Sequence, residues 1–477
     1  MNCTELPNAP LRGAGQPDLA RRIRLLWRHA AAAALCVALT ACGGGGGGGG
    51  GGVPLALLPA ATGAGGSTAP DTGAGSSTGS GSTANAGSGS STGTGSGTSP
   101  DSPPPASNVL AVTVDAGPPG APTQVNIPYV TVTVCAPGGG SCQQIDHVIV
   151  DTGSSGLRLV ASAMQGLGAF PLQQGSGGSA YAECAQFAIG YTWGAMRLAD
   201  VQLGGLTASS QPIQVIGDAA VPGAPASCSN GDVGMNTVAT LGAKGLLGVG
   251  PARNDCGAIC AGMAVPGTYY QCPSGGGSCS AVAMPLAQQL ANPVAQLSSD
   301  YNGVLLQLPA VDPDAGAVRV AGQLVLGIGT RTNNALGNAQ AYGIDPGSFT
   351  FTTSALGRQY AGSFVDSGSN GLYFDTTALA PCTQPGLSGL YCPDSLKNLE
   401  ATNTGTNGTT GSVQFQVNDA NSLLNGHPGS IAYSDLAGTA SGISGFDWGL
   451  PFFFGRSVYT AIEGASTPSG AGPYFAF

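Results

Sequence analysis

Short runs of apolar residues, often alternating with polar ones and separated by Gly, Pro, Asn and Asp, fill the chain from residue 108 to residue 477. Alternation with a period of two is typical of strands that bury one face, and frequent turn residues favour a mainly β fold. The runs that predict strands are 109–114, 129–134, 145–150, 196–203, 213–216, 304–308, 324–328 and 413–417. The only helix candidates are 284–290 and 376–380.

One motif occurs twice within this pattern. The sequence VDTGSSGL at 150–157 returns as VDSGSNGL at 365–372, and each copy follows a short apolar run and enters a Gly-rich turn. A third triplet, Asp71-Thr72-Gly73, lies in a low-complexity stretch with no strand before it, so we discard it. The doubled motif predicts two related halves, each contributing one carboxylate, Asp151 and Asp366.

A second pair of similar segments follows the aspartate motifs. KGLLGVG at 244–250 comes after the first motif, and WGLPFFFG at 448–455 comes after the second at a similar distance. Both segments are apolar and interrupted by glycine, which predicts a buried strand in each case. Each half therefore has the order strand, aspartate turn, buried strand.

This repeated order resembles that of the pepsin-like aspartic peptidases over residues 108–477. The resemblance implies two β lobes, expected at 108–318 and 319–477, that face each other across a cleft. Segment 187–206 is similar to the flap hairpin of that family, in which Tyr191, or alternatively Trp193, would close over the substrate. A closer resemblance is to an uncharacterised family of proteobacterial lipoproteins whose name records only unknown function.

The chemistry implied by the resemblance needs two neighbouring carboxyls. Such groups cannot both ionise cheaply, so they share a proton; the ionised one can deprotonate a water while the other donates to the scissile carbonyl. The catalytic pair would be Asp151 and Asp366. The supporting positions are Thr152 and Ser367, which would hydrogen-bond across the lobe interface, Gly153 and Gly368, which permit tight turns, and Ser154 and Ser369, which would bond the outer carboxylate oxygens. The expected activity is that of an aspartic endopeptidase.

Two positions depart from the pepsin-like pattern. The family usually carries an aromatic residue two positions after Gly156, where this chain has Arg158. The Gly-Asp that is common in the late strand is replaced by Leu450-Pro451. These departures leave an alternative open, in which the same scaffold binds a peptide or glycan at the cell envelope without cutting it.

The N-terminal residues predict export. Four arginines precede an apolar run at 30–39, which ends in Leu39-Thr40-Ala41-Cys42. This is typical of a signal peptide, here 1–41 with an N-terminal extension, and the last four residues resemble a bacterial lipobox in which Cys42 is acylated. Residues 42–107 are rich in Gly, Ser, Thr and Ala and predict a flexible tether. The alternative is an ordinary signal peptide or a buried Ala-rich helix.

Cysteine spacing agrees with export. The chain has 13 cysteines, and the number that remains without Cys3, Cys36 and Cys42 is even. In an exported protein this predicts disulfides, with close partners at 135 and 142, 272 and 279, and 382 and 392. The pairing of the cysteines at 184, 228, 256 and 260 stays open, and zinc is an alternative for the last two.

Charge narrows the range of partners. The formal net charge is −10 at pH 7, which makes nucleic acid and anionic membrane surfaces poor partners. The resemblance to aspartic peptidases implies a peptide or protein substrate, and we expect a monomer that uses no cofactor or metal. It would contact the membrane only through the lipid on Cys42, as a lipoprotein of the bacterial cell envelope on the periplasmic side or the cell surface.

Overall fold

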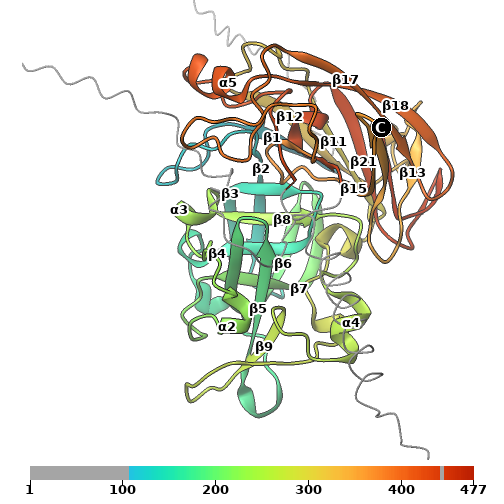
Figure 1. Ribbon diagram of the computed structural model, residues 1–477. Coiled ribbons are helices and arrows are strands. Elements are labelled where there is room, and N and C mark those ends of the chain that lie inside the picture. The colour runs from blue at the N-terminus through green and yellow to red at the C-terminus, as the bar shows by residue number, and fades with distance from the viewer. Residues whose placement is uncertain (1–106, 441–444) are drawn as a thin grey trace, which may run out of the picture.

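The computed structural model describes residues 107–440 and 445–477. The expected signal peptide, Cys42 and nearly all of the tether lie outside these residues. Figure 1 shows a lower body coloured cyan to green and an upper body that is mostly orange and red. Both bodies are built mainly of strands, which confirms the expected mainly β, two-lobed class. No helix among the described residues is long and apolar enough to cross a membrane.

A 15-stranded sheet extends through both bodies in the order β10-β9-β5-β6-β7-β4-β8-β3-β2-β1-β12-β11-β21-β24-β13. Its strands are β1 Val109–Val114, β2 Pro128–Cys135, β3 Cys142–Asp151, β4 Ser155–Val160, β5 Ala180–Phe187, β6 Gly190–Leu203, β7 Leu206–Ile216, β8 Gly245–Val249, β9 Tyr269–Cys272, β10 Ser280–Ala281, β11 Gly303–Leu308, β12 Val320–Leu326, β13 Ala341–Gly343, β21 Arg456–Ala461 and β24 Tyr474–Ala476. All eight runs predicted as strands overlap strands of the structure.

A seven-stranded sheet with the order β18-β17-β14-β15-β20-β16-β19 lies in the upper body. Its strands are β14 Phe351–Ala355, β15 Arg358–Val365, β16 Leu372–Tyr373, β17 Lys397–Thr404, β18 Thr410–Val417, β19 Ala437–Gly438 and β20 Asp447–Trp448; β22 Ser466–Thr467 and β23 Gly470–Ala471 form a separate pair. The α-helices described are short: α2 Ala226–Ser229, α3 Val238–Leu241, α4 Gly257–Gly262 and α5 Ala420–Gly426.

The two halves repeat one strand arrangement. β3 pairs in parallel with β8, and β8 pairs antiparallel with β4, which follows the first aspartate turn. In the same way β15 pairs in parallel with β20, and β20 pairs antiparallel with β16. The duplication predicted from the sequence is therefore present in the hydrogen-bonded topology.

Three expected elements differ from the structure. Residues 376–380 contain no helix, and 284–290 contain only the 3-10 turn η6, Leu286–Gln288. Pro285 and Pro381 lack a backbone donor, and segments this short gain too few hydrogen bonds to offset helix nucleation. The late segment 448–455 is not one buried strand. β20 contributes its first residue, and a 3-10 turn, η9 Leu450–Phe453, follows because Pro451 fixes a helical φ near its start.

Five disulfides join the described cysteines. The bonds 135–142, 272–279 and 382–392 are those predicted from spacing. The open pairing is resolved as Cys184–Cys228 and Cys256–Cys260, so the latter two are bonded to each other instead of binding zinc. Cys184–Cys228 ties β5, on one side of the expected flap hairpin, to α2.

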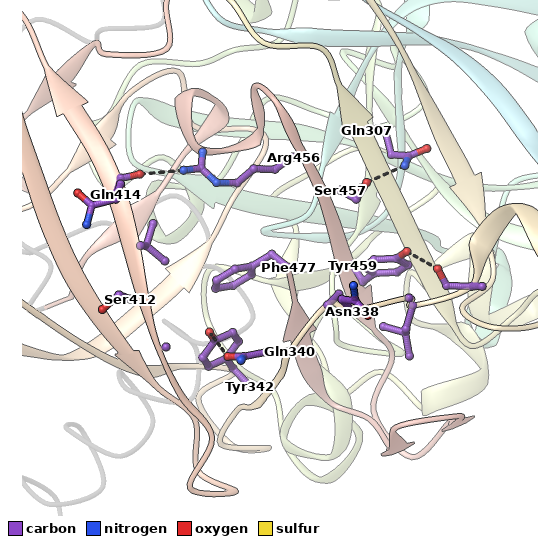
Figure 2. A pocket seen from close by; sticks show the side chains of 16 residues that line it. Gln307, Asn338, Gln340, Tyr342, Ser412, Gln414, Arg456, Ser457, Tyr459 and Phe477 are labelled. Carbon is purple, nitrogen blue, oxygen red and sulfur yellow. Dashed lines mark hydrogen bonds between the residues drawn. The ribbon is translucent and has the colours of Figure 1, made fainter.

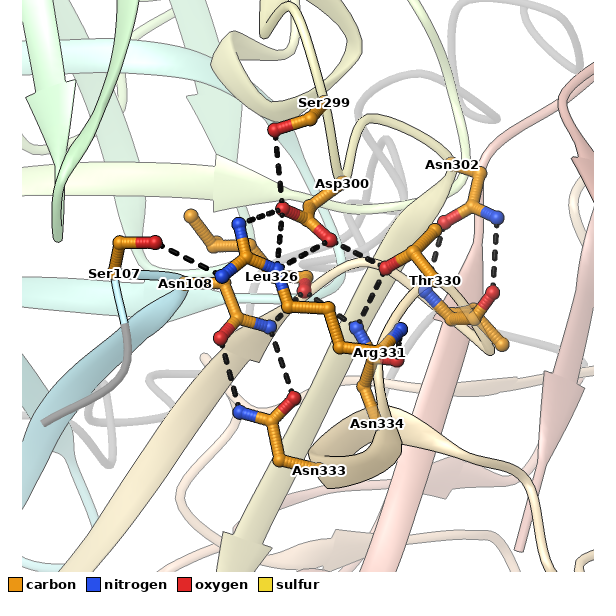
Figure 3. Close-up of polar contacts among 11 residues, drawn as sticks. Ser107, Asn108, Ser299, Asp300, Asn302, Leu326, Thr330, Arg331, Asn333 and Asn334 are labelled. Carbon is orange, nitrogen blue, oxygen red and sulfur yellow. Dashed lines mark hydrogen bonds and ion pairs between the residues drawn. The ribbon is translucent and has the colours of Figure 1, made fainter.

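A polar network fastens the start of β1 to the turn after β12 (Figure 3). The Arg331 guanidinium donates to Asp300 at 2.6 Å and to the Ser107 hydroxyl at 2.9 Å. Asn108 and Asn333 exchange side-chain hydrogen bonds across the same place. The first described residues are thus held against the strands that join the two bodies.

Candidate active site

Two strands lead directly into the two aspartates. β3 ends at Asp151, and β15 ends one residue before Asp366. Both side chains are fully buried, and their carboxyls lie within hydrogen-bonding reach of each other. The structure therefore brings together the two residues that the doubled motif singled out.

In each motif, the glycine that follows the Thr or Ser donates a backbone hydrogen bond to one oxygen of the aspartate carboxylate. The Gly153 N–H donates to Asp151 Oδ1 at 2.8 Å, and the Gly368 N–H donates to Asp366 Oδ1 at 2.8 Å. A Cβ on residue 368 would lie 2.8 Å from Asp151 Oδ1, closer than real Cβ contacts allow. Glycine is required at 368 because the opposite carboxylate occupies the space of a side chain.

A serine in each turn holds the other oxygen. The Ser154 hydroxyl donates to Asp151 Oδ2, and the Ser369 hydroxyl donates to Asp366 Oδ2 at 2.8 Å. Each carboxylate thus receives one backbone and one hydroxyl donor from its own turn. The immediate surroundings of the two groups are nearly the same.

The second residue of each triplet links the two halves. Thr152 Oγ1 donates to the carbonyl of Val365 at 3.1 Å, and Ser367 Oγ donates to the carbonyl of Val150 at 2.7 Å. Each hydroxyl also accepts the other residue's backbone N–H, at 2.9 and 3.1 Å. Four buried hydrogen bonds therefore fix the two turns relative to each other, in the way the resemblance implies.

The environment of Asp366 favours its protonated form. Burial raises the pKa of Asp366 well above its usual range, and the negative charges of Asp151 and Asp447 raise it further, while the Ser369 hydrogen bond opposes the shift. Two buried carboxyls in contact titrate as a pair and share one proton over a broad range of pH. The arrangement can supply one ionised and one protonated carboxyl at the same time.

Sequence reasoning missed a third buried carboxyl beside the pair. Asp447 is the first residue of β20, and only 4% of it is exposed. Burial raises the pKa of Asp447 well above its usual range, although Ser369 opposes this as a hydrogen-bonding neighbour. A signal was present: Asp447 is a single acid between Phe446 and Trp448, in a segment that is otherwise apolar.

The segment that resembles a flap forms the turn between β5 and β6 and the strand β6, and its two predicted aromatic residues have other contacts. Tyr191 exchanges backbone hydrogen bonds with Val233 and Met235. Trp193 is buried, packs edge-on against Tyr270 and donates its indole N–H to a loop carbonyl. Neither residue has a described contact with the two aspartates, so their part in closing over a substrate stays a prediction.

Arg158, where the family pattern has an aromatic residue, anchors this hairpin. Its guanidinium lies 2.6 Å from Glu183 of β5 and 3.7 Å from Asp255, and all three side chains are buried. Burial disfavours the charge, but the two adjacent carboxylates hold the pKa of Arg158 above its ordinary value. A buried ion pair thus links β4 to β5 at the place where the family pattern has an aromatic residue.

A separate hollow of about 810 Å³ lies between β18 and the strands β11 and β21 (Figure 2). None of the predicted site residues lines it. Its polar side chains bond to one another: Gln307 donates to Ser457, and the Tyr342 hydroxyl donates to Gln340. We assign no ligand to this hollow, since these groups already have partners.

The strand topology and the paired aspartate turns define a two-lobed fold of the pepsin-like aspartic proteinase class. Residues 104–477 match the family described as "Protein of unknown function (DUF3443)", and the chain belongs to that family. No curated protein is matched by the sequence. Among solved structures, the chain is similar to the aspartic proteinase from Irpex lacteus, with 18% identity, 77% of this chain and 96% of that chain covered, and a TM-score of 0.42.

Proposed function

We propose that this protein is an aspartic endopeptidase that hydrolyses peptide bonds with Asp151 and Asp366. The observation that carries the proposal is the pair itself: two fully buried carboxyls in hydrogen-bonding reach, each held by equivalent donors from its own turn. Perturbed carboxyls in contact are a recurrent feature of catalytic sites. A chain that needed these residues only for turns would gain nothing from placing two acids together in its interior, where desolvation opposes their charge.

The reaction follows from the protonation states of the pair. The ionised carboxyl takes a proton from a water molecule as the water oxygen bonds to the scissile carbonyl carbon, and the protonated carboxyl donates its proton to the carbonyl oxygen. The resulting tetrahedral diol has no covalent bond to the protein. Protonation of the amide nitrogen then breaks the C–N bond, and collapse of the diol releases an amine and a carboxylic acid while the pair regains one proton.

The test is an assay of a peptide library from pH 3 to 7 with the full chain and the variants Asp151→Asn and Asp366→Asn. We expect each variant to lose roughly 10²- to 10⁴-fold in rate, as for removal of a general acid or base. Asp71→Asn is the matched control, since it changes the same kind of triplet in the low-complexity segment and should leave the rate unchanged. Absence of cleavage, or cleavage that neither site variant affects, contradicts the proposal. Binding of a peptide or glycan without turnover would favour the alternative, a non-catalytic scaffold.

We further propose that the protein is exported and anchored in the cell envelope through a lipid on Cys42. The five disulfides support this, because such bonds persist mainly in oxidising compartments. Fractionation of cells tests it: wild type should sediment with membranes, and Cys42→Ala should not. A variant that still sediments with membranes would exclude this anchor.

A further inference from the structure

We propose that Asp447 is a positioning residue for the aspartate pair: acting on Asp366 through Ser369, it makes the pair retain its shared proton to higher pH than two carboxyls alone. The catalytic consequence rests on the proposed endopeptidase function. The structural basis does not, because it comes from a comparison of the two halves of the molecule.

The duplicated strands identify the counterpart of Asp447. In the first half, β8 pairs with β3 so that Leu246 lies opposite Ile149, two residues before Asp151. In the second half, β20 pairs with β15 so that Asp447 lies opposite Phe364, two residues before Asp366. Leu246 and Asp447 therefore occupy the same place in the repeated motif, and one half has a buried leucine where the other has a buried acid.

The acid is unfavourable for folding at this place. Asp447 Oδ1 has no hydrogen-bond partner among the described residues, although the side chain is almost completely buried. Burial of a poorly paired polar group costs roughly 1–3 kcal/mol, whereas Leu246 in the equivalent position packs in an apolar cluster. Stability of the strand arrangement thus gives no reason for an acid at 447.

The acid lies where it can act on the pair. Ser369 Oγ donates to Asp366 Oδ2 at 2.8 Å, and the Asp447 carboxyl lies near the same hydroxyl. The hydrogen bond from Ser369 favours the ionised form of Asp366, so any weakening of this bond helps the pair to keep its proton. An ionised Asp447 would compete with Asp366 for the serine proton and would oppose a second negative charge nearby.

The groups that face Asp447 give the direction of the effect. The charges involved are those of Asp151 and Asp366, and the residue across the strand pair is Tyr373, whose hydroxyl donates to Asn370. Each carboxyl raises the cost of ionising the others. Removal of the acid at 447 therefore makes the last shared proton of the pair easier to lose.

The experiment compares the full chain with Asp447→Asn and Asp447→Leu, the second of which copies the first half of the molecule and is expected to fold. In both variants the alkaline limb of the kcat/KM profile should move to lower pH by about one unit, as expected for loss of one nearby carboxyl. Asp435→Asn is the matched control: Asp435 is another buried acid of the same lobe, but it is not among the charges that raise the Asp366 pKa. In a Ser369→Ala background the Asp447→Asn shift should shrink to less than half.

A second readout does not depend on turnover. In protein with ¹³C-labelled aspartate carboxyls, the higher titration of the Asp151 and Asp366 pair should move to lower pH in Asp447→Asn. Unchanged titration and an unchanged alkaline limb in both 447 variants would overturn the inference, and a shift unaffected by Ser369→Ala would overturn the route through serine. A shifted titration without any peptide cleavage would support the role of Asp447 and refute the endopeptidase function. Cleavage that depends on Asp151 and Asp366, without a shift in the Asp447 variants, would support the endopeptidase function and refute the role of Asp447.

Discussion

Replacement of Arg158 by Met should strongly destabilise the protein at neutral pH. Met keeps most of the aliphatic stem but removes the guanidinium that lies 2.6 Å from Glu183 and 3.7 Å from Asp255. The same guanidinium donates to the Ser155 carbonyl at 3.0 Å, and the Tyr269 hydroxyl donates to Asp255. The substitution leaves a buried acidic cluster without its counter-charge.

The size of the stability loss in Arg158→Met depends on how many buried charges lose their partner. Burial raises the pKa of Asp255 well above its usual range, and the Glu183 charge raises it further, so Asp255 takes up a proton readily. One carboxylate, that of Glu183, is then left uncompensated in the interior. Removal of one partner of a buried pair costs about 3–5 kcal/mol, so we expect a loss of that size at pH 7. The loss should be smaller at pH 4, because acid reduces the number of uncompensated negative charges in the cluster.

Urea unfolding at pH 7 and pH 4 measures this cost in Arg158→Met, Glu183→Gln and the double variant. The double variant should be more stable than the sum of the single losses predicts, because it leaves no buried charge unpaired. Lys397→Met is the control, since it breaks an ion pair in which Asp394 is 87% exposed, and it should leave the stability unchanged. A cost below about 1 kcal/mol at pH 7, or one that does not depend on pH, would refute the reasoning.

Two further predictions concern the second half of the molecule. Gly368→Ala should abolish peptide cleavage, because the new Cβ would lie 2.8 Å from Asp151 Oδ1 and force the carboxyls apart; Gly426→Ala, which has open space around its Cβ position, should cleave normally in the same assay. Burial raises the pKa of Asp435 to about 7, so its contribution to stability is complete below the unfolded pKa near 4 and is lost as pH rises toward 7. At roughly 1.4 kcal/mol per pKa unit, the stability lost on ionisation of Asp435 is up to about 4 kcal/mol. Asp435→Asn should therefore be more stable than wild type at pH 8 but not at pH 4. The same difference between the unfolding midpoints of the two proteins at both pH values would contradict this prediction.

The strands could be predicted because their signal is local. Alternation in 109–114, for example, corresponds residue for residue to β1, where every second side chain is buried against the core. The helix candidates failed because a short apolar segment has no period that separates a turn from a helix. The segment after Trp448 also failed, since its apolar composition indicated burial correctly while Pro451 decided the conformation.

In the candidate site too, features with a local sequence signal could be predicted, and features formed by distant residues could not. Asp151 and Asp366 could be found because the motif around each is contiguous and occurs twice. The cluster of Arg158, Glu183 and Asp255 could not, because its members are far apart in the sequence and each lies in an unremarkable local context. They meet only in the folded chain, where Arg158 lies on β4, Glu183 on β5 and Asp255 in the segment after β8.

The duplicated motif alone cannot make the two carboxyls different, although the proposed chemistry needs one that is ionised and one that is protonated. Their nearest donors are equivalent, a glycine N–H and a serine hydroxyl for each. In the next layer the halves differ at Leu246 and Asp447, and also at Arg158 and Tyr373, which lie opposite them. The acid at 447 raises the cost of ionising Asp366, whereas the equivalent place in the first half holds an apolar side chain. The asymmetry of the proposed reaction would then originate in residues that differ between the two halves, Asp447 among them.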